Sequence, residues 1–205
     1  MIIKAIIFDL GGVVINLDFS NFINKIISQS PLSKPQTPTM LEFFKQSDTY
    51  HQGKMSNAEF YHLACDIFQV CALDQAGFFT AFNSIISGFN PKITELIKDL
   101  HKTGQYKLIA LSNINSSHWK YLSGKNWGFI EYFDELVLSH EIQLIKPQPK
   151  IFEYVIQKAG CEPKEIVFID DGLNNIRSAK NFGIKGINYT TFKDLIVELQ
   201  KLEIL

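Results

Sequence analysis

The chain has 205 residues, of which 46% are hydrophobic and 20% charged, a composition that is ordinary for a globular protein and excludes a disordered one. Twenty Lys and Arg against 21 Asp and Glu leave a net charge of -1, and no basic cluster indicates nucleic acid or a membrane surface. Three cysteines, an odd number at no metal-ligand spacing, argue against a disulfide framework and against a zinc site.

The N-terminus runs directly into an apolar segment, without the charged leader and small-residue cleavage site of a signal peptide. No apolar run reaches the ~18 residues that a membrane-spanning helix needs. We therefore predict a cytoplasmic protein that binds neither nucleic acid nor a membrane and whose partner is a small molecule. The sequence carries no sign of its oligomeric state.

The first predicted element is a strand over residues 2–10, which is apolar apart from Lys4. Such a run is typical of a strand that is covered on both faces in a parallel sheet. Asp9 stands where the strand ends, and ligands bind beyond the carboxyl ends of such strands. Gly11 and Gly12 would let the backbone approach an anion closely. An isolated aspartate before two glycines is more often a turn cap than a reactive group. The choice between these two interpretations of Asp9 therefore depends on the residues that follow the later strands.

The stretch over residues 16–89 is predicted to be entirely helical and to form a small lobe. Its first helix is expected to break at prolines, namely Pro31, Pro35 and Pro38. Ser56 and Glu59 have the spacing of a capping box, and Asp74 is placed to cap a further helix that extends to Ile86. The many phenylalanines of this stretch indicate packing of the lobe rather than a flavin or haem pocket.

From Asn90 onward, helices and strands alternate. A helix capped by Asn90 ends at Gly104. Predicted strands cover residues 107–113, 135–139, 165–170 and 186–189, and predicted helices cover 149–159, 174–182 and the C-terminus. This alternation is typical of a doubly wound α/β fold with a parallel sheet. We therefore predict an α/β core over residues 1–15 and 90–205, with a helical cap over 16–89 inserted into it.

Further polar groups follow the predicted strands of the core. Ser112 and Asn113 end an apolar strand with a hydroxyl and an amide, which suit an oxyanion but also occur in ordinary turns. Lys146 precedes a proline, which favours an extended backbone that would aim the ammonium group into a site. Asp170 and Asp171 end another strand, and two adjacent carboxylates repel each other unless a cation neutralises them.

Taken in order, the motifs around Asp9, Ser112, Lys146 and residues 170–171 resemble the four motifs of the haloacid dehalogenase (HAD) superfamily. The resemblance covers nearly the whole chain. It implies a Rossmann-like core whose motifs occupy the ends of neighbouring strands. The predicted helical lobe is similar to the family's cap, which is inserted after the first motif.

Three segments, 8–14, 51–56 and 168–171, resemble more narrowly a branch of this family. That branch includes sugar-phosphate phosphatases and the N-terminal phosphatase domain of epoxide hydrolases. The resemblance implies hydrolysis of a small phosphomonoester, with a sugar phosphate as one candidate, through an aspartyl-phosphate intermediate. It also implies Mg²⁺ as cofactor and a small phosphorylated metabolite as partner.

By the same resemblance, Asp9 is the nucleophile of the reaction. Magnesium would be held by Asp9, the backbone carbonyl of Gly11 and Asp171, an oxygen-only set that suits this hard cation. Lys146 would neutralise both Asp9 and the phosphoryl oxygens.

The resemblance also assigns the binding and supporting residues. Ser112, together with backbone amides at Gly12 and Asn113, would bind the phosphoryl oxygens. Asp170 would orient Lys146 or a water ligand of the metal. Asn175 falls where relatives often have a second acid, and it is expected to bind such a water.

Position 11 departs from the pattern of many relatives, which have a second aspartate two residues after the nucleophile. The side chain of Gly11 cannot move a proton, and general acid-base help is worth ~100 to 10,000-fold in rate. A water, the substrate or a cap residue would have to carry the proton. His51 and Lys54 of the cap are the candidates and are predicted to contact the substrate, although each is equally consistent with an ordinary surface residue.

Three alternatives stay open at this point. The first is a hydrolytic haloacid dehalogenase of the same fold, which Asp170 and Asp171 disfavour because carbon–halogen displacement needs no cation. The second is a non-catalytic module that binds a phosphorylated metabolite and has lost turnover through Gly11. The third is a phospho-receiver domain, in which paired acids would normally follow the first strand.

Overall fold

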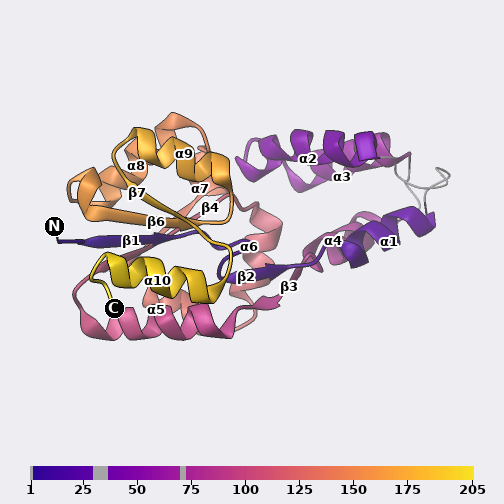
Figure 1. Ribbon diagram of the computed structural model, residues 1–205. Coiled ribbons are helices and arrows are strands. Elements are labelled where there is room, and N and C mark those ends of the chain that lie inside the picture. The colour runs from indigo at the N-terminus through magenta and orange to yellow at the C-terminus, as the bar shows by residue number, and fades with distance from the viewer. Residues whose placement is uncertain (1, 30–36, 70–72) are drawn as a thin grey trace.

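The computed structural model describes residues 2–29, 37–69 and 73–205, and its centre is a five-stranded parallel sheet (Figure 1). The strands lie in the order β5-β4-β1-β6-β7. Their bounds are Ala5–Phe8 for β1, Lys107–Ser112 for β4, Glu135–Leu138 for β5, Ile166–Asp170 for β6 and Lys185–Asn188 for β7. The predicted doubly wound α/β fold is confirmed.

Helices cover both faces of this sheet. In Figure 1, α8 (Pro149–Ala159) and α9 (Leu173–Asn181) lie above it, and α5 (Pro91–Thr103) and α10 (Phe192–Lys201) lie below it. Shorter elements connect them: α6 (Ser116–Ser123), α7 (Ser139–Ile142) and two 3₁₀ turns, η1 (Phe129–Tyr132) and η2 (Pro163–Glu165).

The side chains of β1 show why its sequence is apolar throughout. Ile6 and Phe8 belong to the core shared with α5 and α10, whereas Ala5 and Ile7 belong to the core shared with α8 and α9. Successive residues of a strand point to opposite faces, so a strand with helices on both sides has no polar face. All four side chains are fully buried.

The register of the sheet brings the polar strand ends to one edge. Phe8 lies beside Ala110 of β4 and Ile169 of β6, and all three strands run in the same direction. The residues that follow therefore emerge together: Asp9 after β1, Ser112 at the end of β4 and Asp170 at the end of β6.

In the part that the structure describes, the second lobe contains four helices with an aromatic core of its own. These are α1 (Ser20–Gln29), α2 (Thr37–His51), α3 (Asn57–Phe68) and α4 (Gln75–Asn83). The capping box of Ser56 and Glu59 and the cap by Asp74 are both present, as predicted. Tyr50 stacks on Phe60 with ring centroids 4.1 Å apart, and the phenylalanines of this lobe pack against one another.

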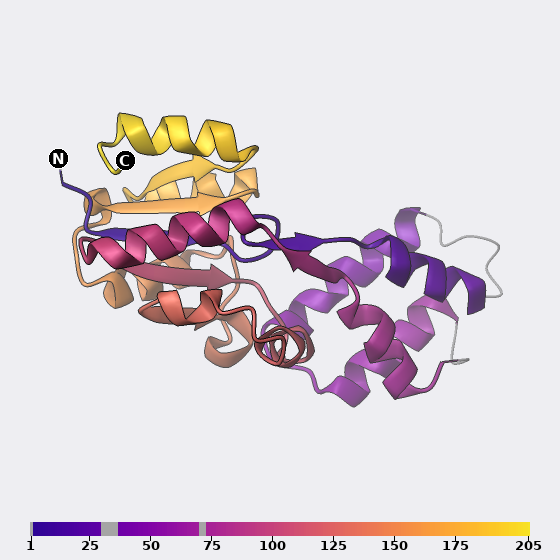
Figure 2. The same cartoon turned by 90° about the horizontal axis from the view of Figure 1, so that it is seen from below.

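The prediction that residues 16–89 are entirely helical is wrong at both ends. β2 (Ile15–Leu17) and β3 (Ile86–Phe89) form an antiparallel ribbon that joins the lobe to the core (Figure 2). The two chain segments that connect the lobes run side by side, and their backbone N–H and C=O groups form hydrogen bonds with each other. This pairing outweighs the helical propensity of the two segments. Accordingly α4 stops at Asn83 rather than extending to Ile86.

Pro38 does not break a helix but lies in the first turn of α2, where a missing N–H costs nothing. Pro31 and Pro35 lie outside the described residues. The division into a core over 1–15 and 90–205 and a cap over 16–89 stays a prediction. For brevity, α1 to α4 are called the cap below.

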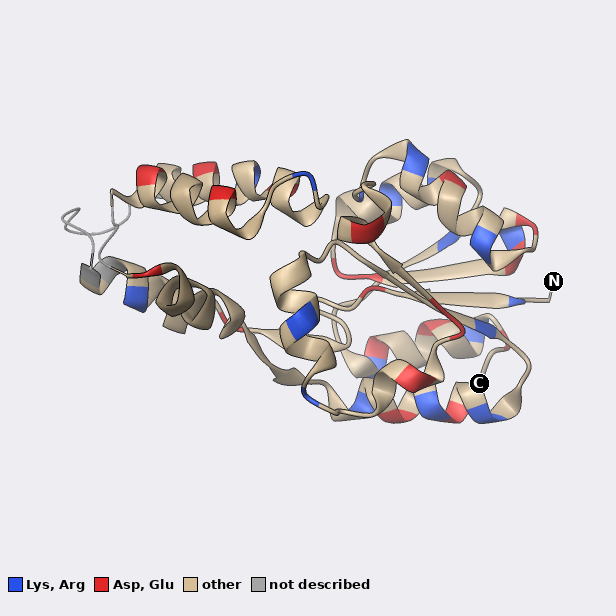
Figure 3. Cartoon of the chain, turned by 180° about the vertical axis from the view of Figure 1, so that it is seen from behind, with Lys and Arg blue, Asp and Glu red and all other residues tan. Residues whose placement is uncertain are grey.

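Charged residues are spread over both lobes, with Lys and Arg interspersed among Asp and Glu (Figure 3). This matches the net charge of -1. Within the described residues, no helix is both long and apolar enough to cross a membrane.

Candidate active site

Asp9 lies directly beyond β1 and is only 7% exposed. Its backbone N–H donates to the carbonyl of Ile169 at 2.9 Å, so the end of β6 holds it in place. Burial is the main cause that raises the pKa of Asp9, to about 7, and the charge of Asp170 adds to this. The ammonium of Lys146 opposes the rise. Asp9 is therefore a carboxylate in a site where negative charge is costly.

Lys146 is the cation that neutralises this site. Its Nζ lies 2.9 Å from Asp9 Oδ1 and 2.7 Å from Asp170 Oδ2, and it also donates to the carbonyl of Leu111 at 3.0 Å. The residue is only 4% exposed. Burial alone would lower the pKa of Lys146, but the two carboxylates outweigh burial and raise it. The ammonium thus stays charged between two acids that lie at the ends of neighbouring strands.

Asn113 fixes the backbone that carries Lys146. Its side-chain Oδ1 accepts from the Lys146 N–H at 2.8 Å, and its Nδ2 donates to the Lys146 carbonyl at 2.9 Å. The Asn113 side chain therefore acts as a positioning group for the lysine, which sequence reasoning missed. The predicted contact of Asn113 with phosphate stays a prediction. Because the side chain is bonded to the Lys146 backbone, the backbone N–H of Asn113 would make that contact.

Asp170 is fully buried, and its carboxylate accepts hydrogen bonds from other groups besides Lys146. Its Oδ1 accepts from the Gly172 N–H at 2.7 Å and from Asn175 Nδ2 at 2.9 Å. The supporting role predicted for Asp170, orientation of Lys146 or of a metal-bound water, stays a prediction. Asn175 contacts Asp170 directly, and its predicted contact with a water stays a prediction.

Asp171 completes a cluster of three acids with Asp9 and Asp170. One carboxylate oxygen from each lies within 4.8 Å of the others. Partial burial, together with the charge of Asp170, raises the pKa of Asp171. Gly12 has a φ of +76°, and a Cβ there would come within 2.2 Å of Asp171 Oδ2, so only glycine fits beside this acid.

Comparison with known proteins assigns the chain to a family. A family model described as haloacid dehalogenase-like hydrolase matches residues 3–183, which include every site residue named above. The chain belongs to the HAD-like hydrolases.

Two relatives and one solved structure illustrate the match. The D-ribitol-5-phosphate phosphatase of Bacteroides thetaiotaomicron is 28% identical over 89% of this chain and 90% of its own length. The bifunctional epoxide hydrolase 2 of Rattus norvegicus is 32% identical over 35% of this chain and 13% of its own. A HAD-family enzyme of Bacteroides thetaiotaomicron, solved with magnesium and inorganic phosphate, has a TM-score of 0.77 and 28% identity, covering 94% of this chain and 98% of that one.

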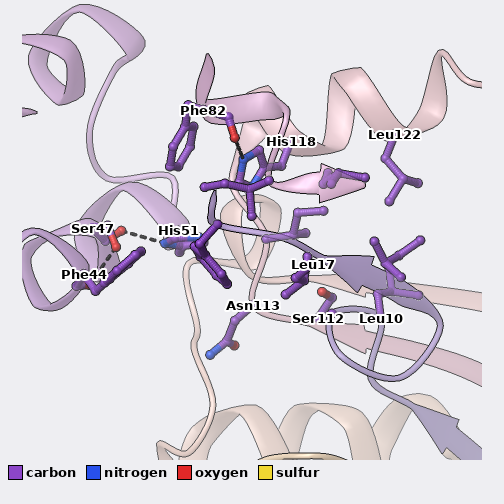
Figure 4. Close-up of a pocket in the computed structure, with 16 residues that line it drawn as sticks. Leu10, Leu17, Phe44, Ser47, His51, Phe82, Ser112, Asn113, His118 and Leu122 are labelled. Carbon is purple, nitrogen blue, oxygen red and sulfur yellow. Dashed lines mark hydrogen bonds between the residues drawn. The ribbon is translucent and has the colours of Figure 1, made fainter. Parts of the chain in front are cut away.

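In this HAD-like hydrolase, a cavity of about 160 Å³ lies at the end of β4, against Leu10 and Gly11, which follow Asp9 (Figure 4). Gly11, Ser112 and Asn113 line it from the core. Ser112 is only 3% exposed. The predicted contacts of Ser112 with phosphate and of the Gly11 carbonyl with metal stay predictions. Position 11 brings no side chain that can move a proton.

His51, at the end of α2, reaches the cavity, whereas Lys54 does not line it. Both ring nitrogens of His51 are engaged: Nδ1 with the Ser47 carbonyl at 2.8 Å and Nε2 with Asn115 Nδ2 at 3.3 Å. Lys54 Nζ donates to Gln52 Oε1 at 2.5 Å. The predicted contacts of His51 and Lys54 with substrate, and their candidacy as proton carriers, stay predictions.

A hydrogen-bond network of His51, Asn115 and His118 joins the cap to the core, and sequence reasoning gave Asn115 and His118 no role. Asn115 caps α6 and also donates from Nδ2 to His118 Nδ1 at 3.2 Å. His118 Nε2 bonds to the Phe82 carbonyl of α4 at 3.0 Å. Since a carbonyl only accepts, Nε2 of His118 carries the proton, as does Nδ1 of His51. Both rings are therefore held neutral.

Burial lowers the pKa of His118 to about 4, which predicts a pH dependence of stability. The unfolded chain protonates this residue near its ordinary pKa of about 6.5, so stability is complete above that pH and falls as the pH drops toward 4. Between pH 7.5 and 5, wild type should lose about 2 kcal/mol more unfolding free energy than His118→Gln. Urea unfolding at the two pH values measures this. An equal loss in both proteins would contradict it.

Proposed function

We propose that this HAD-like hydrolase is a magnesium-dependent phosphatase of small phosphomonoesters that works through a phosphorylated Asp9. The observation that carries the proposal is the 2.9 Å contact between Lys146 Nζ and Asp9 Oδ1 at a strand edge. A carboxylate attacks a phosphoryl group only where the negative charge of both is offset. Lys146 supplies such charge, and the Ser112 hydroxyl lies at the same edge.

The reaction would proceed in two displacements at phosphorus. In the first, a carboxylate oxygen of Asp9 forms a bond to phosphorus and the bond between phosphorus and the alcohol oxygen breaks. The alcohol oxygen takes up a proton from a water, from the substrate's own phosphate or from a cap residue, and the alcohol leaves. In the second, water attacks the phosphorus of the aspartyl phosphate, which releases inorganic phosphate and restores the carboxylate. Lys146, Ser112 and backbone amides at the strand edge would bind the phosphoryl oxygens throughout.

The cluster of Asp9, Asp170 and Asp171 fits a magnesium site. Its donors are all oxygen, and three carboxylates gather around one lysine, with burial raising the pKa of Asp9 and Asp171. Asp9, the Gly11 carbonyl and Asp171 would hold the ion, while Asp170 pairs with Lys146. Magnesium bound there would offset the charge of the phosphoryl group. The similar Bacteroides structure contains both magnesium and phosphate, which supports the assignment.

The haloacid dehalogenase alternative has less support from this site. Carbon–halogen displacement needs no metal, and a cluster of three acids would repel the carboxylate that a haloacid carries. The sugar phosphate suggested by sequence resemblance stays a prediction. The similar ribitol-phosphate phosphatase supports a small phosphorylated metabolite in general.

A panel of phosphomonoesters, assayed for phosphate release with magnesium and with a chelator, tests the proposal. We expect turnover that falls at least ~1,000-fold when the metal is removed and returns when magnesium is added back. A panel of 2-haloacids serves as the control for the alternative. Turnover that persists in chelator, or halide release without phosphate release, would refute the proposal.

A further inference from the structure

The active-site cavity is mainly apolar, although it opens onto the strand edge that carries the reacting groups. Ten of its sixteen lining residues have apolar side chains. Most of these come from the ribbon, the cap and the segments that join them: Ile15, Leu17, Phe19, Phe44, Phe82, Ile85 and Ile86. Figure 4 shows Phe44 and Phe82 on one side of the cavity and Leu10 and Leu122 on the other, with Ser112 at the core end. A substrate phosphate at Ser112 would therefore place its alcohol portion among these side chains.

Away from Ser112 and Asn113 at the core end, the polar side chains of the cavity wall have their protons already engaged within the protein. Ser47 Oγ donates to the Phe44 carbonyl at 2.6 Å. His51 Nδ1 donates to the Ser47 carbonyl, and His118 Nε2 donates to the Phe82 carbonyl. The remaining nitrogen of each ring accepts from Asn115 Nδ2. Among the described lining residues there is no Asp, Glu, Lys or Arg.

Such a wall discriminates against hydroxyl groups. A hydroxyl that enters the cavity leaves its water partners and meets side chains whose donors are engaged, which is unfavourable. A methylene group that enters the cavity contributes its full free energy of transfer out of water to binding. The volume of about 160 Å³ is similar to that of an apolar cavity that accommodates a benzene ring, hence a group of about six carbons.

We propose that this cavity binds the apolar portion of the substrate, so that the enzyme hydrolyses monophosphates of alkyl or aryl alcohols of about six carbons in preference to polyol phosphates. The inference rests on the proposed phosphatase function and names the substrate class of the same site. It differs from the sugar phosphate that the sequence resemblance suggests.

The test compares two series of primary-alcohol phosphates, whose leaving groups have similar chemistry. For n-alkyl phosphates from methyl to hexyl, kcat/KM should rise about fourfold with each added methylene group. Pentyl phosphate should exceed the pentitol phosphate with the same number of carbons by about 100-fold. Calorimetry with the matching non-hydrolysable phosphonates, in the presence of magnesium, should show the same order of affinities.

A pair of substitutions on α2 connects the preference to the cavity. Phe44 lines the cavity, and Phe44→Gln keeps a good helix former while placing an amide in the wall. It should lower kcat/KM for hexyl phosphate by about 10-fold, with a loss that shrinks as the chain shortens, and should narrow the gap to the pentitol phosphate. Leu41→Gln on the same helix is the control, because Leu41 is 64% exposed and does not line the cavity.

The outcomes separate this inference from the function on which it rests. If polyol phosphates are hydrolysed with magnesium as well as or better than alkyl phosphates, the inference fails and the phosphatase function stands. If no phosphomonoester is hydrolysed, the phosphatase function fails, and phosphonate affinity that rises with chain length would still support an apolar subsite. Phosphonate affinity independent of chain length would overturn the subsite as well.

Discussion

Replacing Asp9 by asparagine is expected to reduce kcat for phosphomonoesters by at least ~10,000-fold, because the amide oxygen cannot act as the nucleophile. Released phosphate measures the loss under saturating substrate and magnesium. The structure also predicts that the variant folds. Burial raises the pKa of Asp9, so its negative charge is not favoured by the site, and Lys146 keeps Asp170 as a partner at 2.7 Å.

Two further measurements make the Asp9→Asn result specific. Denaturant unfolding should show a free energy within about 1 kcal/mol of wild type, since the amide has nearly the same shape. Asp99→Asn, at an exposed position on α5, is the matched control and should retain full activity. Turnover that survives in Asp9→Asn would show that another group is the nucleophile, and the proposed mechanism would then be wrong.

The core of the site was accessible to sequence reasoning because it is built from strand ends. In a parallel sheet, a run of apolar residues predicts the strand, and the next polar residue predicts what emerges at the edge. Asp9, Ser112 and Asp170 each follow this rule, and the sheet places them together. Lys146 lies in a loop rather than at a strand end, and it was predicted from the proline that follows it and from its resemblance to a family motif.

The contacts between cap and core were not accessible in the same way. His51, Asn115 and His118 belong to helices of different lobes, and their local sequence contains no pattern that pairs them. The ribbon of β2 and β3 joins segments about 70 residues apart, and its strands are too short for their alternation to be distinguished from a helix. The apolar cavity depends on both of these contacts, so its chemistry became visible only in the folded chain.

Replacing Lys146 by methionine is expected to have a large effect on both activity and stability. Methionine keeps the length of the side chain but leaves Asp9 and Asp170 buried without their cation. Breaking a buried ion pair in this way typically costs about 3–5 kcal/mol of unfolding free energy. Losing the ammonium beside the phosphoryl oxygens should lower kcat by about 1,000-fold. Urea unfolding and phosphate release measure the two effects.

The double variant Lys146→Met/Asp170→Asn tests whether the instability of Lys146→Met comes from unpaired carboxylate charge or from lost side-chain packing. Asp170 loses its charge but keeps a carbonyl oxygen that can accept from the Gly172 N–H and Asn175 Nδ2, as Oδ1 does in wild type. If the instability of Lys146→Met arises from unpaired carboxylates, the second change should recover about half of the lost unfolding free energy, because one of two unpaired acids is removed. Activity should not recover, since the ammonium near Asp9 is still missing. A double variant no more stable than Lys146→Met would show that the lysine contributes through packing on Phe168 and its bond to the Leu111 carbonyl rather than through charge.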